Sequence, residues 1–287
     1  MAGLPPPLLG DFETVVDAMD AARAQFGSRE AYVEGDRRLT FDGWVDAADR
    51  LARVMVERGV RPGDVVALML PASIDYAIAY AAAVRAGAVA TGLNPRLGPR
   101  EVAAILDRAA PALVVGEGGA IRRDDLAAAC AGPPLGADRR RGHRDDPVVI
   151  IWTSGTTGTP KGAWFDHDGL RAAVASAGAM SAPFDRRLSA TPFAHAGYMA
   201  KLWEQLAWGL ALVLTPTPWT VADTVRLLAE ERITVAGAVP TQWAKIVEAP
   251  GLDAAKDLRL ALSATAPAPP ALVERIGRTL GCPVVVR

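Results

Sequence analysis

The chain has 287 residues, of which 51% are hydrophobic and 22% are charged. This length suffices for one large or two medium domains, and the composition is typical of a folded globular protein. The formal net charge of −1 provides no global attraction to nucleic acid or to an anionic membrane, so neither is expected as a partner.

The first half of the chain alternates helical and extended patterns. Apolar residues at helical spacing predict amphipathic helices, and short apolar runs between turn signals predict buried strands. The expected helices cover 14–26, 42–58, 73–85 and 98–108, and the expected strands cover 31–33, 38–41, 64–70, 89–91 and 112–115.

Residues 132–146, rich in Gly, Pro, Arg and Asp, interrupt this alternation and are predicted to be a linker. Beyond them, the expected strands are 148–153, 188–191, 211–214, 234–238, 258–262 and 283–286, and the expected helices are 168–180, 198–208, 221–231, 241–247 and 270–280. Repeated strand–helix–strand units predict an α/β fold of parallel-sheet layers flanked by helices. We therefore expect an N-terminal α/β subdomain at 1–131, a linker at 132–147 and a second subdomain at 148–287.

The sequence shows no membrane span, no secretory signal and no metal-ligand spacing. No segment reaches the roughly 20 apolar residues of a membrane span, and the N-terminus lacks the basic start of a secretory signal. Cys130 and Cys282 stand far apart without metal-ligand spacing. A cytoplasmic protein with two reduced thiols, no transmembrane segment and no metal site is expected. The oligomeric state is left open, a homo-oligomer included.

The most informative segment is Ile-Ile-Trp-Thr-Ser-Gly-Thr-Thr-Gly-Thr-Pro-Lys-Gly at 150–162. It follows a buried strand, and ligands of parallel α/β sheets bind at the carboxyl ends of strands. Glycines let the backbone approach a ligand, successive N–H groups form an anion nest, and hydroxyls and a lysine add donors. The segment therefore predicts a nucleotide-phosphate loop, with the expected binding residues Thr153, Ser154, Gly155, Thr156, Thr157, Gly158 and Lys161.

The spacing excludes a Walker A loop. That motif needs Gly, four residues and then Gly-Lys-Ser/Thr. Counting from Gly155, the second glycine would fall on Pro160, and Gly162 follows Lys161 instead of preceding it. P-loop kinase and NTPase functions are therefore excluded.

The segment at 150–162 resembles the AMP-binding signature of the adenylate-forming superfamily, which includes acyl-CoA synthetases and peptide-synthetase adenylation domains. The resemblance extends over further segments of the chain, namely Leu39-Thr40-Phe41, Gly63 to Ala67, Gly87 to Arg96, Thr191 to Gly197 and Val239-Pro240-Thr241. It implies two half-reactions: a carboxylate and ATP give an acyl-adenylate and pyrophosphate, and a thiol then takes the acyl group.

The resemblance also assigns expected roles. Lys161 and His195 are the expected catalytic residues: Lys161 neutralises the leaving pyrophosphate, and His195 stands beside the carboxylate pocket. His195 is expected either to orient or gate the acid or to cap the following helix, and both interpretations remain open. The expected acid and adenine pocket comprises His195, Ala196, Gly197, Ser263, Ala264, Thr265, Ala266 and Pro267.

Two local features refine these assignments. Relatives usually read Ser-Gly-Gly-Ala-Pro where this chain has Ser263 to Pro267, and a β-branched residue at Thr265 disfavours a positive φ. Amino-acid-activating relatives usually carry an Asp near His195, which is absent from Phe193 to Gly197. An acid without an α-amine is therefore favoured. His167 is expected to cap a helix rather than to act in catalysis.

The resemblance covers roughly the first half of a typical member. The Tyr-Gly-x-Thr-Glu segment, the ribose-binding Asp and the C-terminal domain with its catalytic Lys do not occur in these 287 residues. We expect the N-terminal part of the adenylate-forming fold, with the C-terminal domain absent and the Mg²⁺ ligands largely outside this chain, and little adenylation by this chain alone.

The leading interpretation is an ATP-dependent acyl-CoA ligase that uses ATP, Mg²⁺ and coenzyme A on a small carboxylic acid, with fatty acid metabolism as its setting. The alternatives are a non-catalytic nucleotide- or acyl-binding module or truncated remnant, and an amino-acid adenylation domain. The sequence leaves open which acid is used and whether a carrier protein replaces coenzyme A.

Overall fold

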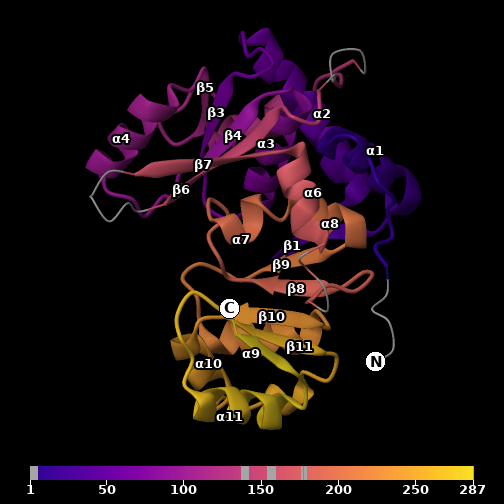
Figure 1. The fold of residues 1–287 in the computed structure, drawn as a ribbon, viewed down its shortest axis with the longest axis vertical. Helices are drawn as coiled ribbons and strands as arrows, with labels where there is room; N and C mark the ends of the chain where they lie inside the picture. The colour runs from indigo at the N-terminus through magenta and orange to yellow at the C-terminus, as the bar shows by residue number, and fades with distance from the viewer. Residues whose placement is uncertain (1–5, 137–141, 154–159, 176, 178–179, 287) are drawn as a thin grey trace.

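A computed structural model describes residues 6–136, 142–153, 160–175, 177 and 180–286. Its described strands form a five-stranded and a seven-stranded sheet, and helices cover both (Figure 1). The expected α/β class with parallel-sheet layers is therefore confirmed.

The five-stranded sheet lies in the upper part of Figure 1 and has the order β5-β3-β4-β6-β7. Its strands are β3 (Val65–Met69), β4 (Val89–Gly92), β5 (Leu113–Gly116), β6 (Pro147–Thr153) and β7 (Lys161–Asp166). Strands β5, β3, β4 and β6 are parallel to one another, whereas β7 pairs antiparallel with β6. Strand β7 was not expected, because it is an edge strand exposed from Lys161 to Trp164 and shows no alternation of buried and exposed residues.

The seven-stranded sheet has the order β12-β11-β10-β8-β9-β1-β2. Its strands are β1 (Glu30–Glu34), β2 (Arg37–Thr40), β8 (Arg186–Ser189), β9 (Ala211–Leu214), β10 (Val235–Ala238), β11 (Leu260–Ser263) and β12 (Val284–Val286). All neighbours are parallel except β1 and β2, which pair antiparallel. The carboxyl ends of β8, β10 and β11 thus meet at one edge of this sheet.

The helices follow the predicted order with two differences. They are α1 (Val15–Phe26), α2 (Phe41–Glu57), α3 (Ile74–Arg85), α4 (Pro99–Ala109), α5 (Leu126–Ala129), α6 (His167–Ala175), α7 (Ala196–Met199), α8 (Leu202–Trp208), α9 (Val221–Glu230), α10 (Pro240–Ile246) and α11 (Pro270–Leu280). The helix expected at 198–208 is divided into α7 and α8, because the Lys201 N–H bonds the Tyr198 carbonyl in a tighter turn (2.8 Å). The helix expected at 168–180 ends at Ala175 within the described residues.

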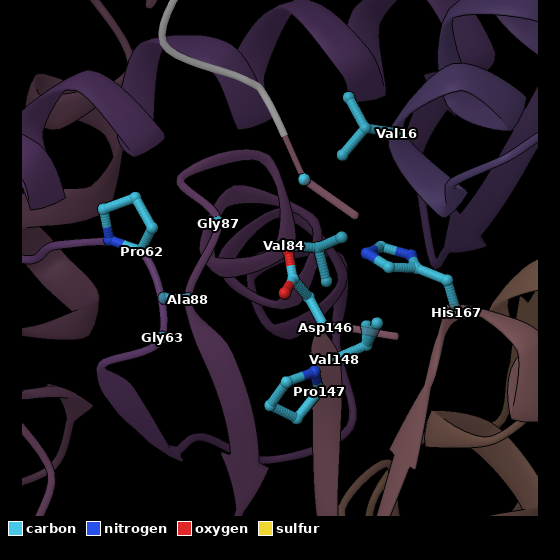
Figure 2. A pocket seen from close by; sticks show the side chains of 11 residues that line it. Val16, Pro62, Gly63, Val84, Gly87, Ala88, Asp146, Pro147, Val148 and His167 are labelled. Atoms are coloured by element: carbon cyan, nitrogen blue, oxygen red, sulfur yellow. The ribbon is translucent and has the colours of Figure 1, made fainter. Parts of the chain in front are cut away.

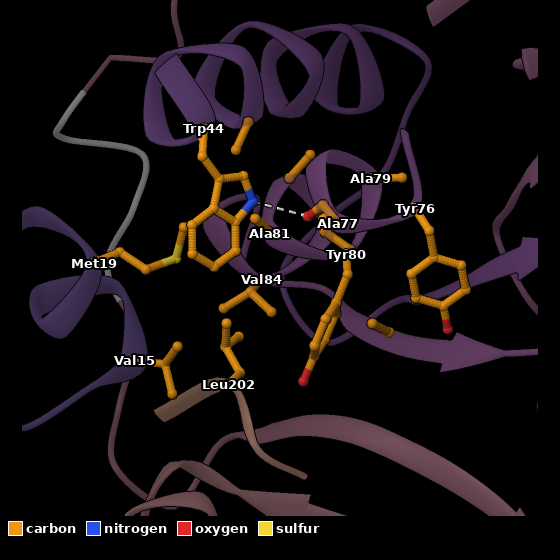
Figure 3. Packing of buried hydrophobic residues seen from close by; sticks show 14 of the residues in the cluster. Val15, Met19, Trp44, Tyr76, Ala77, Ala79, Tyr80, Ala81, Val84 and Leu202 are labelled. Carbon is orange, nitrogen blue, oxygen red and sulfur yellow. Dashed lines mark hydrogen bonds between the residues drawn. The ribbon is translucent and has the colours of Figure 1, made fainter. Parts of the chain in front are cut away.

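The main apolar core lies around α2 and α3 and also includes residues of α1, α6 and α8. The Trp44 indole in α2 donates a hydrogen bond to the Ala77 carbonyl in α3 (3.0 Å), and Tyr80 and Leu202 lie in the same cluster (Figure 3). Each sheet takes strands from both sides of residue 148. The division at 1–131, 132–147 and 148–287 therefore remains a prediction about folding units, and it does not correspond to the two sheets.

A buried ion pair joins α2 to α3 in this core. Arg85 is fully buried, and its guanidinium contacts both carboxylate oxygens of Asp49, which is 1% exposed, at 2.5 and 3.0 Å. Asp20 accepts a third hydrogen bond from Arg85 at 2.8 Å. Without Asp49, the buried guanidinium of Arg85 would keep Asp20 as its described carboxylate partner, and the Asp20 side chain is half exposed.

We expect Asp49→Ala to lower the free energy of unfolding by about 3–5 kcal/mol, since loss of one partner leaves a buried charge uncompensated. Urea denaturation followed by circular dichroism measures the change. The matched control is the double variant Asp49→Leu with Arg85→Met, which removes both charges and is expected to cost less. A single variant as stable as the unchanged chain would contradict this prediction.

Candidate functional site

The turn between β6 and β7 carries the predicted phosphate loop. Thr153 ends β6 and pairs with Lys161, the first residue of β7, and the Thr153 hydroxyl donates to the Lys161 carbonyl at 3.3 Å. Lys161 and Gly162 were expected in a loop, and this is corrected: both belong to a strand. The expected binding residues Ser154, Gly155, Thr156, Thr157 and Gly158 lie outside the described residues.

Strand packing holds the two ends of this turn. The Trp152 indole donates to the Thr91 hydroxyl at 2.7 Å, and that hydroxyl donates to the Ile150 carbonyl at 3.0 Å, which ties β6 to β4. A Cβ at Gly162 would lie 2.9 Å from the Ile150 side chain and 3.3 Å from the Trp152 ring. A side chain at 162 would therefore displace Ile150 or Trp152, so glycine at this position lets β7 pair closely with β6.

His195 is the residue before α7, and its side chain caps that helix. Its Nδ1 accepts a hydrogen bond from the Gly197 N–H at 3.0 Å. The capping role that the sequence left open is thus present in the structure. Its other ring nitrogen has no protein partner in the described part of the chain, so capping leaves that nitrogen available to a ligand.

Aromatic packing fixes the segment around His195. The rings of Phe193 and Tyr198 stack with centroids 3.6 Å apart. Two buried tyrosines of α3 reach α7 from beneath: Tyr80 donates to the Met199 carbonyl at 2.8 Å, and Tyr76 donates to the Met199 sulfur at 3.3 Å. The segment that carries His195 is therefore held by the main apolar core.

Two cavities meet at His195. The smaller, about 230 Å³, is lined by His195, Pro192 and Ala194 together with two residues that flank the predicted phosphate loop, Thr153 and Pro160. The larger, about 490 Å³, is also lined by Pro192 and His195 and extends over the carboxyl ends of β8, β10 and β11. His195 thus stands in the wall that the two cavities share.

The larger cavity contains half of the predicted pocket residues. His195, Gly197, Ala264 and Thr265 line it, whereas Ala196, Ser263, Ala266 and Pro267 are not among its lining residues. Sequence reasoning missed Arg187, Lys201, Glu204 and Gln242, which also line it. No motif marks them: Lys201 and Glu204 stood inside an expected helix, and their place at the cavity follows from the packing of α8 against α1 and α6.

Thr265 departs from the expectation drawn from its side chain. Its φ is +70°, in the left-handed region that a β-branched residue disfavours. The threonine therefore disfavours this conformation without preventing it, because the backbone after β11 still adopts a positive φ. Such a conformation costs about 1–2 kcal/mol for a residue with a Cβ.

Thr265→Gly is therefore expected to raise the free energy of unfolding by about 1 kcal/mol, because glycine adopts this φ without the Cβ clash. Ala264→Gly is the control: its φ is not positive, so glycine there is expected to destabilise by about 0.5–1 kcal/mol. Chemical denaturation of both variants provides the comparison, and destabilisation by Thr265→Gly would contradict it.

His167 lies at a separate cavity of about 170 Å³, lined also by Val16, Pro62, Gly63 and Asp146 (Figure 2). Its Nδ1 accepts a hydrogen bond from the Val15 N–H, the first donor of α1, at 3.0 Å. The expectation that His167 caps a helix is met at α1, whereas the helix that His167 begins is capped by Asp166, which accepts a hydrogen bond from the Gly169 N–H at 2.6 Å. Burial lowers the pKa of the imidazole, and carboxylates including Asp146 and Asp17 oppose that shift less strongly.

A lowered pKa in the folded protein means that protonation favours the unfolded chain. The destabilisation is absent above the ordinary value near 6.5 and grows as pH falls below it. We expect His167→Asn, whose amide oxygen can replace Nδ1 as the acceptor, to lose less stability than the unchanged chain between pH 7.5 and about 5. The exposed His143→Asn is the control, and identical pH profiles for all three proteins would refute the prediction.

The described residues contain neither a membrane-spanning helix nor a metal-binding cluster. No described helix is long and apolar enough to cross a membrane. No group of three or more His, Cys, Asp or Glu side chains is placed to hold a metal ion within the described ranges.

Comparisons with known proteins agree on a single family. The family model described as AMP-binding enzyme matches residues 19–287. The long-chain-fatty-acid–CoA ligase FadD13 of Mycobacterium tuberculosis is 31% identical over 272 residues, covering 85% of this chain and 54% of that protein. The probable nonribosomal peptide synthetase CymA of Salinispora arenicola is 32% identical over 249 residues, covering 85% of this chain and 3% of that protein.

Solved structures show the same fold. The inhibitor-bound N-terminal domain of FACL13 from Mycobacterium tuberculosis aligns with a TM-score of 0.81 and 28% identity, covering 96% of this chain and 75% of that one. The chain spans about half the length of FadD13, the curated ligase that it matches.

Proposed function

Since the chain belongs to the AMP-binding enzyme family, we propose that it serves in the ATP-dependent activation of a carboxylic acid without an α-amine. The acid is converted to an acyl-adenylate, and coenzyme A is the thiol acceptor of the second step. The observation that carries the proposal is the meeting of two cavities at His195, one bounded by the phosphate turn and the other by Ala264 and Thr265.

The first half-reaction joins the acid proposed for one cavity to the nucleotide proposed for the other. A carboxylate oxygen of the acid attacks the α-phosphorus of ATP, a new bond forms between that oxygen and phosphorus, and the bond to the β-phosphate oxygen breaks. Pyrophosphate carries away the negative charge. Lys161 and the backbone N–H groups of the 153–161 turn are proposed to stabilise it, as donors aimed at developing charge do in other phosphoryl transfers.

His195 is proposed to orient the acid at the junction. Its Nδ1 is occupied by the Gly197 N–H, which fixes the ring plane and leaves the other nitrogen to donate toward a carboxylate. In the second half-reaction the thiol sulfur attacks the acyl carbon, the bond to the phosphate oxygen breaks, and AMP leaves. Mg²⁺ would offset phosphate charge in the first step.

An amino-acid substrate is the main alternative, and it is favoured by the likeness to CymA. The charges of the larger cavity argue against it. Glu204 is an acidic residue of its wall, and both carboxylate oxygens already face cations, Arg187 and Lys201. An α-ammonium group would therefore find no uncommitted carboxylate among the described lining residues.

The proposal predicts that Lys161 acts on the outer phosphates. We expect Lys161→Ala to weaken ATP binding about tenfold or more, the effect of losing a charge-assisted hydrogen bond. AMP lacks those phosphates, so its affinity is expected to change less than about twofold. Calorimetric titration of this chain with each nucleotide measures both.

Lys256→Ala, which removes an exposed lysine elsewhere, is the control and is expected to leave both affinities unchanged. Equal losses for ATP and AMP would contradict the role of Lys161. ATP binding by a full-length protein that forms no AMP with fatty, aryl or amino acids would instead favour a non-catalytic nucleotide-binding module.

A further inference from the structure

Three charged side chains stand on one wall of the larger cavity. Arg187 belongs to β8, Lys201 precedes α8, and Glu204 lies within α8. Glu204 is 2% exposed, and the side chains of Arg187 and Lys201 are 16% and 25% exposed. Charges buried to this degree need partners, because desolvation disfavours each of them.

Both carboxylate oxygens of Glu204 face cations, although its buried Oε2 has no partner in hydrogen-bond geometry among the described residues. Its Oε1 lies 2.8 Å from Nη1 of Arg187 and accepts a hydrogen bond from the Ser181 hydroxyl at 2.6 Å. Its Oε2 lies 2.6 Å from Nζ of Lys201. Burial by itself opposes ionisation, but these two cations lower the pKa of Glu204, so the group is a carboxylate at neutral pH.

The wall therefore carries two cations against one anion. The neighbouring buried carboxylate, Asp185, does not change this balance, because the guanidinium of Arg259 contacts it at 2.8 Å. Among the described residues of this wall, one positive charge is left in excess.

Hydrogen-bond donors are also in excess at the same place. The ammonium group of Lys201 has three N–H donors, and Glu204 is its one partner in the described part of the chain. The Nε of Arg187 is buried and has no partner among the described residues. A single cation would be enough to neutralise Glu204, so neutralising it does not explain why there are two.

We propose that this wall binds a second anionic group of the substrate, so that the acid activated by the protein is a dicarboxylic acid. One carboxylate meets ATP beside His195, and the other pairs with Lys201. Lys201 is then a specificity-determining residue rather than a catalytic one. The inference rests on the proposed function and narrows its substrate class. A second carboxylate would supply the missing charge and accept from the unused Lys201 donors.

Non-hydrolysable adenylate analogues test this on the chain itself. Acyl sulfamoyl adenosines are prepared in matched pairs with butanoyl, hexanoyl and octanoyl chains, each with and without a terminal carboxylate. We expect the carboxylate-bearing member of at least one pair to bind about tenfold more tightly by calorimetry. The preference is expected to decrease as salt rises.

Three variants locate the effect. Lys201→Met is expected to reduce the preference to less than about twofold, whereas Lys201→Arg keeps the charge and most of the preference. Lys245→Met, at an exposed lysine of α10, is the control and is expected to leave it unchanged. Thermal unfolding of each variant checks that the fold is retained.

The outcomes separate the two proposals. If both members of every pair bind equally, the dicarboxylate inference is overturned and the adenylation proposal stands. If no analogue binds, the adenylation proposal fails and the inference fails with it. A preference that survives unchanged in Lys201→Met would overturn the assignment of Lys201 as the group that binds the second carboxylate.

Discussion

The buried contact between α3 and α7 is the constraint on which the site depends. Tyr76 and Tyr80 of α3 both bond to Met199, and Tyr198 beside it stacks on Phe193. These side chains belong to the main core, which also contains strands of both sheets. Because a packed core resists displacement, it holds the short helix α7 and its capping residue His195 in one position.

That position explains how segments distant in sequence form one site. His195 lies between the cavity that reaches the β6–β7 turn and the cavity that covers the ends of β8, β10 and β11. In parallel α/β sheets the carboxyl ends of strands are the usual places for ligands. Here two sheets present such ends, and α7 marks the boundary between them. A reaction that joins a nucleotide to an acid needs this kind of junction.

The electrostatics of the larger cavity differ from those of a purely apolar acyl pocket. Glu204 is held by Arg187, Lys201 and Ser181 in a place where burial penalises every charge. The strained backbone of Thr265 lines the same cavity. Both features cost stability, and costs of this kind concentrate at functional sites rather than at structural ones.

The sequence by itself determined the family, the α/β class and most elements, because strand and helix periodicity and the segment at 150–162 are local patterns. It missed β7, whose edge position leaves it without a buried face, and it joined α7 to α8 across the tight turn at Lys201. It also expected a loop where Lys161 and Gly162 form a strand. These errors arise where strand pairing or a single turn, and not a periodic local pattern, decides the conformation.

Only the tertiary structure decided which side chains share a cavity. The sequence identified His195 and Thr265, but it gave no sign that Lys201, Glu204 and Arg187 face them. Their placement depends on how α8 packs against α1 and α6, contacts between distant segments that no local pattern encodes. The expectation of a phosphate loop therefore rests on residues in a row, whereas the charge of the larger cavity followed from the fold.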